Sequence, residues 1–161
     1  MPPQQPPSIQ ESLDLDQLDR SIVSGDFVHL SDGWVHYEVG GPSTGQSVVL
    51  VHGFSVPDYI WDPTFQALTR AGFHVLRYDL YGRGFSDRPD RPYNEELFDR
   101  QLTALLDALG FHAPVDVIGL SLGGAITAVF CSRHPERVRR LVFISPAGMP
   151  MKRPMAAVVL Q

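Results

Sequence analysis

The segment Gly119-Leu120-Ser121-Leu122-Gly123 carries the strongest indication of chemistry in this sequence. A serine with glycines two residues away on either side is typical of a nucleophile elbow, a tight strand-to-helix turn that holds the hydroxyl above a sheet. Larger side chains at Gly119 and Gly123 would collide with neighbouring backbone, so we predict structural roles for both glycines. We predict that Ser121 is a nucleophile.

A serine nucleophile needs two backbone N–H donors aimed at the oxygen that becomes negatively charged during acyl transfer. The amide of Leu122, directly after the serine, is the first candidate. The second is the amide of Phe54, because Gly53 lets the loop after the run Ser47–Val51 come close. We interpret His52 in this loop as a structural hydrogen-bonding residue and not as the catalytic base.

A second glycine-rich loop begins at Asp79 and continues through Gly82 and Gly84. The glycines permit a tight loop, and the carboxylate of Asp79 can hold its backbone N–H groups together. The alternative is a catalytic acid, but Asp79 precedes Ser121, whereas the acid follows the serine in the usual order for this kind of site. We therefore predict a structural role for Asp79.

The elements that position these loops follow from the apolar pattern. Residues 26–30 and 34–39 are predicted to form an antiparallel hairpin. The sequence then predicts strands over 47–51, 73–78, 115–118 and 140–145, and helices over 59–70, 95–109 and 122–133. Strands that alternate with helices require crossover connections, which produce a mostly parallel sheet. The predicted fold class is α/β, with helices on both faces of the sheet and the antiparallel hairpin at its N-terminal side. Functional groups then gather at the carboxyl ends of the strands.

The three loops, in this order and spacing, resemble the α/β-hydrolase fold family, in its branch of epoxide-hydrolase-like enzymes, esterases and C–C hydrolases. The resemblance runs from about Gly33 to Gly148 and covers the N-terminal part of the family's core. Dehalogenases and epoxide hydrolases carry aspartate at the elbow, so Ser121 implies esters, lactones, thioesters or vinylogous diketones. The loop after His52 differs from the His-Gly-Gly-Pro-Gly loop of proline iminopeptidases, which argues against a peptidase. The resemblance implies no metal and no organic cofactor.

The base and the acid that a serine nucleophile requires have no good candidate in the sequence. No Asp or Glu follows Glu136 and no His follows His134, whereas the family places both groups after later strands. His134 lies at the far end of the helix that starts beside Ser121, nearly 20 Å away at about 1.5 Å per residue. We interpret His36 and His74 as strand-surface residues, distant from the carboxyl ends of the strands.

These observations predict a truncated hydrolase core. Residues 1–20 are expected to be a disordered tail with room for one short helix, 21–148 the N-terminal portion of the core, and 149–161 the start of a lid. The expected function is that of a serine hydrolase that acts on a small carboxylic ester through an acyl-enzyme, like an esterase or a monoacylglycerol lipase, with this chain inactive by itself. The alternatives are a C–C hydrolase of meta-cleavage products and a non-catalytic, hydrolase-like interaction domain.

Composition excludes several other classes. The formal net charge of −5 provides no basic field for nucleic acid. One cysteine, Cys131, excludes an internal disulfide framework and a multi-cysteine zinc site. The first ten residues lack the basic and apolar regions of a signal peptide, and polar residues interrupt the apolar stretch 115–131, so we expect a cytoplasmic protein without a stable membrane span. Nothing in the pattern indicates an oligomeric state.

Overall fold

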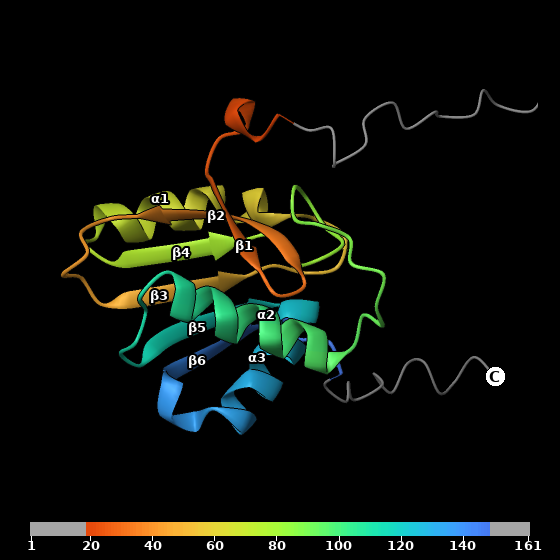
Figure 1. The fold of residues 1–161 in the computed structure, drawn as a ribbon. Coiled ribbons are helices and arrows are strands. Elements are labelled where there is room, and N and C mark those ends of the chain that lie inside the picture. Colours follow the sequence, from red (N-terminus) through yellow and green to blue (C-terminus); the bar gives the residue numbers. More distant parts are fainter. Residues whose placement is uncertain (1–18, 149–161) are drawn as a thin grey trace, which may run out of the picture.

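The structure is a computed structural model that describes residues 19–148, so the predictions for residues 1–18 and for the lid segment 149–161 lie outside the described residues. A six-stranded sheet with strand order β1-β2-β4-β3-β5-β6 forms its centre (Figure 1). The strands are β1 (Asp26–Leu30), β2 (Gly33–Gly40), β3 (Ser47–Val51), β4 (His74–Tyr78), β5 (Val115–Leu120) and β6 (Val138–Ile144). The helices are α1 (Asp62–Arg70), α2 (Glu95–Ala108) and α3 (Leu122–Arg133), with 3-10 turns η2 (Arg20–Ile22), η3 (Asp58–Trp61) and η4 (Pro135–Arg137).

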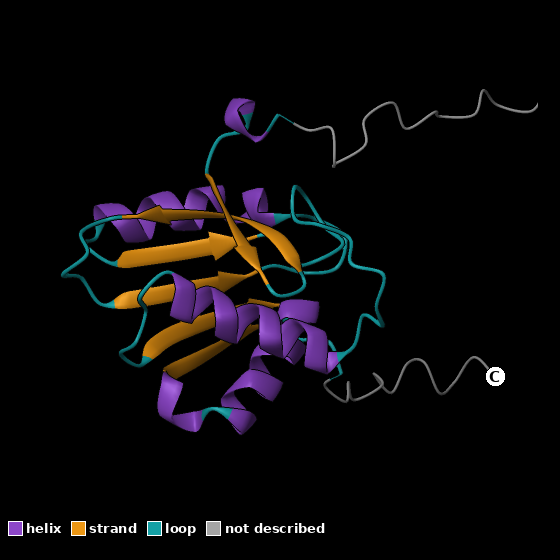
Figure 2. Ribbon diagram, viewed as in Figure 1, coloured by secondary structure: helices purple, strands orange, loops and turns teal. Residues whose placement is uncertain are grey.

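The sheet combines both directions of pairing. β1 pairs with β2 and β2 with β4 in antiparallel fashion, whereas the pairs β4–β3, β3–β5 and β5–β6 are parallel. Helices lie on both faces, with α1 on one and α2 and α3 on the other (Figure 2). The predicted α/β class, the N-terminal hairpin and the mostly parallel arrangement of the later strands are therefore confirmed.

Alternate residues of β3 show how the two faces are filled. Val49 and Val51 are buried in the cluster that includes α2 and α3, while Val48 and Leu50 are buried in the cluster that includes Phe65 of α1. Side chains on a strand alternate between its faces, so a run of consecutive apolar residues fits a strand that is covered on both sides. The position of β3 in the middle of the sheet follows from this pattern.

Helix α2 begins and ends at local signals. The Asn94 side chain accepts a hydrogen bond from the Leu97 amide at 3.1 Å, which satisfies one of the free N–H groups of the first turn. Gly110 follows the helix with φ of 75°, a conformation that glycine adopts at no steric cost. Between these caps, the apolar stripe packs onto the sheet and is buried: Leu97, Phe98, Leu102, Leu105 and Leu106. The helix thus covers the face that carries Val49 and Val51.

Several predicted elements differ in their bounds, and two of these differences bear on the site. The segment predicted as one helix over 59–70 is divided into η3 and α1, because Pro63 has no N–H to donate and fits only the first turn of a helix. Strand β5 continues to Leu120, two residues beyond the predicted end, because Gly119 and Leu120 pair with β6. The strand therefore runs directly to Ser121.

At the other side of the sheet, β6 pairs only with β5 among residues 19–148. Its last residues are exposed large hydrophobic side chains: Val142, Phe143 and Ile144. Within the described part of the chain, no helix combines the length and the apolar character that a membrane crossing requires.

Candidate active site

Ser121 lies in the turn between β5 and α3 with φ of 52° and ψ of −115°. A positive φ is uncommon for a residue with a side chain and costs about 1–3 kcal/mol, so the surroundings must hold it in place. The Ser121 amide donates to Ile144 O at 3.0 Å, and its carbonyl accepts hydrogen bonds from Ala147 N at 2.8 Å and Gly124 N at 3.0 Å. The end of β6 and the loop that follows it therefore hold the strained turn.

The glycines around Ser121 have no room for a side chain. A Cβ atom at Gly119 would lie 2.5 Å from Thr127 Oγ1, and one at Gly123 would lie 2.5 Å from His52 O and closer still to Val51 O. These contacts are with helix α3 and with the backbone of β3, which cannot move aside without opening the sheet. The tight packing of β3, β5 and α3 thus requires glycine at both positions.

The loop after β3 lies directly against the serine. A Cβ atom at Gly53 would be 3.2 Å from Ser121 Cβ, and the next residue is Phe54. Neither the Phe54 amide nor the Leu122 amide donates to an acceptor among the described residues. Leu122 is the first residue of α3, where helix geometry leaves N–H groups without partners and concentrates partial positive charge. Two unpaired donors therefore flank Ser121.

His52 is fully buried in the same loop. Its Nδ1 lies 2.7 Å from Gly53 O, which can only accept, and its Nε2 accepts a hydrogen bond from the Leu80 amide at 2.9 Å. The ring is therefore neutral, with its proton on Nδ1. Burial, which outweighs the other influences, lowers the pKa of His52. Because both ring nitrogens are engaged, His52 cannot accept the proton of Ser121.

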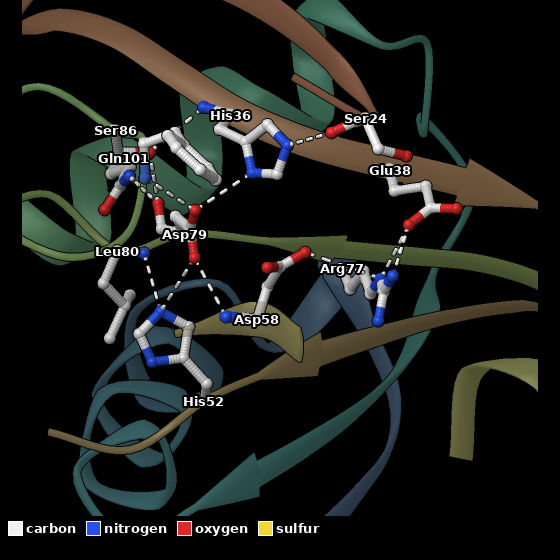
Figure 3. Close-up of polar contacts among 11 residues, drawn as sticks. Ser24, His36, Glu38, His52, Asp58, Arg77, Asp79, Leu80, Ser86 and Gln101 are labelled. Carbon is white, nitrogen blue, oxygen red and sulfur yellow. Dashed lines mark hydrogen bonds and ion pairs between the residues drawn. The ribbon is translucent and has the colours of Figure 1, made fainter. Parts of the chain in front are cut away.

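Asp79, buried at the carboxyl end of β4, joins three segments of the chain (Figure 3). Its Oδ1 accepts a hydrogen bond from Asp58 N at 2.9 Å, and its Oδ2 accepts from Phe85 N at 3.0 Å and from His36 Nδ1 at 2.9 Å. Burial alone would raise the pKa of Asp79, but these bonds, led by that of His36, lower it. A Cβ atom at Gly84 would overlap the carboxylate. The three hydrogen bonds that the Asp79 carboxylate accepts thus tie two loops and strand β2 together.

His36 corrects a prediction: it is not a strand-surface residue distant from the carboxyl ends but is buried beside Asp79. Antiparallel pairing of β2 with β4 sets Tyr37 opposite Tyr78 and so brings His36 next to the residue that follows β4. Its Nε2 donates to Ser24 O at 2.8 Å, while Nδ1 faces the Asp79 carboxylate. Burial would lower the pKa of His36, but these two hydrogen bonds raise it. We infer a buried imidazolium–carboxylate pair.

Asp58 completes this polar cluster. Its carboxylate lies 3.4 Å from Arg77, and burial, together with the nearby charge of Asp79, raises the pKa of Asp58 to about 6. The ligand atoms of His36, Asp58 and Asp79 lie within 4.8 Å of one another, a spacing that a metal ion could use. In the ion pair inferred above, however, His36 Nδ1 carries a proton toward Asp79, whereas a metal-binding histidine nitrogen must be unprotonated. The cluster fits an ion pair better than a metal centre.

Two further histidines lie away from the serine loop. His134 follows α3 at its far end, and its Nε2 is 3.2 Å from an Asp99 carboxylate oxygen. His74 is half-buried at the first residue of β4 and stacks on Phe111, with 4.8 Å between ring centroids. Among residues 19–148, no side chain forms a hydrogen bond with Ser121 Oγ, so the described residues include no base engaged with it.

A cavity of about 480 Å³ opens beside the serine turn. Its lining joins the two loops and α2 to the start of α3: Phe54, Gly82, Arg83, Arg88, Tyr93, Phe98 and Leu122. Both residues with unpaired amides, Phe54 and Leu122, border this space. Sequence reasoning assigned no role to Arg83 or Arg88, because their position in the cavity depends on how the loop after β4 folds over the loop after β3.

The chain matches the α/β-hydrolase fold family over residues 46–159 and belongs to that family. It is 34% identical to a 2-hydroxy-6-oxo-2,4-heptadienoate hydrolase of Pseudomonas putida, over 73% of this chain and 43% of that protein. Among solved structures it is similar to a meta-cleavage product hydrolase of Pseudomonas fluorescens, with 29% identity, a TM-score of 0.71, and coverage of 80% of this chain and 47% of that one. It is also similar to an enol-lactonase of Burkholderia xenovorans, with 30% identity, a TM-score of 0.68, and coverage of 72% and 45%.

The fold and the site thus define a hydrolase-family protein whose relatives include lactonases and C–C hydrolases. The chain spans less than half the length of these relatives.

Proposed function

We propose that this chain contributes the nucleophile and the oxyanion-binding loops of a serine hydrolase that acts on carboxylic esters. Ser121 attacks the ester carbonyl, and the amides of Leu122 and Phe54 stabilise the oxygen that becomes negatively charged. The observation that carries the proposal is the positive φ of Ser121, on a turn flanked by two amides without acceptors among the described residues. Structure rarely maintains such strain away from functional sites.

The proton of Ser121 must pass to a base that an acid orients. His52 and His36 each have both ring nitrogens engaged, and Asp79 is bound to loop amides and to His36. We propose that the base and its acid lie outside residues 19–148. Without them the hydroxyl stays protonated at neutral pH, so we expect this chain alone to react only slowly with electrophiles.

A fluorophosphonate probe tests the proposal, because it reacts covalently with serine nucleophiles next to an oxyanion-binding site. We expect mass spectrometry of a polypeptide that joins this chain to a base and an acid to map the adduct to Ser121, and Ser121→Ala to lose it. Ser31→Ala, at an exposed turn of the hairpin, serves as the control and should label as the parent does. An adduct elsewhere, or labelling of Ser121 no faster than that of Ser31, contradicts the proposal and favours a non-catalytic interaction domain.

A second candidate is the hydrolysis of a C–C bond in a ring-cleavage product. It is supported by the relatives named as hydrolases of such compounds, including a 2-hydroxymuconate semialdehyde hydrolase of a Pseudomonas species that is 42% identical over 76 residues. A polypeptide that joins this chain to a base and an acid would be given a 4-nitrophenyl ester and a vinylogous diketone in parallel. Faster turnover of the ester supports esterase activity, and faster loss of the diketone absorbance supports the C–C reaction.

A further inference from the structure

Two arginines border the cavity beside Ser121, and neither is paired with an acid among the residues that the structure describes. Seven of the eleven arginines in residues 19–148 have a carboxylate oxygen within 4.0 Å: Arg20, Arg77, Arg91, Arg100, Arg133, Arg137 and Arg139. Of the other four, Arg70 and Arg140 lie outside the cavity lining, whereas Arg83 and Arg88 belong to it. In a chain with net charge −5, a cavity with two unpaired cations and no carboxylate in its lining favours an anion.

Arg83 is fixed in place before any ligand binds. Its Nε donates to Phe54 O at 2.6 Å, its Nη1 donates to Gly82 O at 2.9 Å, and its guanidinium carbon lies 4.2 Å from the centre of the Phe54 ring. These contacts leave Nη2 without an acceptor in the described part of the chain. A guanidinium held in one position loses little freedom when it binds a carboxylate, so the group is preorganised.

Arg88 supplies a second cation from a more exposed position on the same loop. Burial raises the pKa of Tyr93, and Arg88 and Arg83 oppose this rise, which places both charges within electrostatic reach of the Tyr93 phenol. The remaining walls include apolar side chains of Phe54, Phe98 and Leu122. The cavity therefore combines an apolar wall with a cationic side, and it begins at the residue next to the serine.

We propose that Arg83 and Arg88 bind a carboxylate of the substrate, so that the substrate is an ester with a free acid group at one end and an apolar body. This inference rests on the proposed function, since it places the ester carbonyl at Ser121. The apolar body lies against Phe54 and Phe98 while the carboxylate meets the arginines. Charged hydrogen bonds to a guanidinium are stronger than neutral ones, and they make the acid form the preferred ligand.

Binding of two matched compounds tests this inference without turnover. Monobenzyl succinate carries an ester, an apolar ring and a free acid, and benzyl methyl succinate differs from it by a methyl group that removes the charge. We expect isothermal titration calorimetry with the 161-residue chain to show about tenfold tighter binding of the acid, which corresponds to about 1.4 kcal/mol. High salt should reduce this preference, because it screens exposed charges.

Arg88→Gln should reduce the preference for the acid, because it removes one of the two cations of the cavity and leaves Arg83. The change should not disturb the fold, since Arg88 is exposed and no described residue depends on it for a hydrogen bond or an ion pair. Arg140→Gln is the matched control, because Arg140 is also exposed and unpaired but lies on β6, outside the cavity lining. The inference is overturned if the two compounds bind equally, if neither binds, or if Arg140→Gln changes the preference as much as Arg88→Gln does. Such a result would leave fluorophosphonate labelling of Ser121 unchanged, so the failure of this inference is distinguishable from that of the proposed function.

Discussion

Replacement of Asp79 by asparagine is the sharpest test of how this site is held together. The carboxylate accepts from three N–H donors, one of which is the His36 imidazolium. Asparagine has one acceptor oxygen, so its NH₂ group must face at least one of these donors, which costs about 1–3 kcal/mol for an unsatisfied buried group. It also leaves His36 without its counter-charge, and breaking a buried ion pair costs about 3–5 kcal/mol.

The two effects overlap, because His36 can lose its proton once the carboxylate is gone. We therefore expect Asp79→Asn to lower the free energy of unfolding by about 3 kcal/mol, roughly a hundredfold change in the folding equilibrium. Urea unfolding followed by far-UV circular dichroism measures this quantity. Asp99→Asn is the matched control, because the Asp99 carboxylate pairs with the exposed Arg133 and the half-buried His134, and such pairs are worth about 1 kcal/mol or less.

The reasoning is refuted if Asp79→Asn is no more destabilising than Asp99→Asn. The same variant should slow the labelling of Ser121, because the Asp58 amide anchors the end of the loop that carries Phe54. A variant that unfolds more easily but labels at the parental rate would separate the stability role of Asp79 from its role in the site.

Two further changes test the turn and the ion pair. Gly123→Ala places a methyl group against Val51 O and His52 O, so it should cost about 1–3 kcal/mol from overpacking and abolish labelling of Ser121. Gly72→Ala is strained by its own positive φ but has open space around it, so it should leave labelling intact. His36 has a raised folded-state pKa, so its contribution to stability is full below its ordinary value of 6.5 and is lost as pH rises through the raised value. Urea unfolding between pH 5 and pH 9, about two units either side of neutrality, measures this effect. The free energy of unfolding should fall more steeply with rising pH for the parent than for His36→Gln, and parallel curves would contradict the ion pair.

The acids of the cluster act in opposite directions in the same measurement. The lowered pKa of Asp79 contributes to the stability of the folded state. This contribution is present above the ordinary aspartate value of 3.8 and is lost as pH falls through the lowered pKa. Asp58, with its pKa raised to about 6, costs stability as pH rises from 3.8 through 6. As pH rises further above the Asp58 value of about 6, the comparison with His36→Gln reports increasingly on the histidine, because Asp79 is ionised throughout that range and Asp58 becomes so.

Local signals made much of this protein predictable. Ser47–Val51 and Leu122–Arg133 have the predicted bounds, because a β-branched apolar run and a helix that starts after a glycine-flanked serine are set by neighbouring residues. The elbow was recognisable for the same reason: the glycine spacing records a steric requirement within a few residues of Ser121. The turn before α1 was not anticipated, although Pro63 signalled it.

The amino-acid sequence by itself determined the alternation of strands and helices, the strained turn at Ser121 and the family, since each depends on residues close together in the chain. Only the tertiary structure decided the partners that hold and surround that turn. His36 meets Asp79 across 43 positions, and Arg83 meets Phe54 across 29, because strand order and loop packing bring them together. Periodicity records which face of an element is buried, but it carries no information about which distant polar group lies opposite.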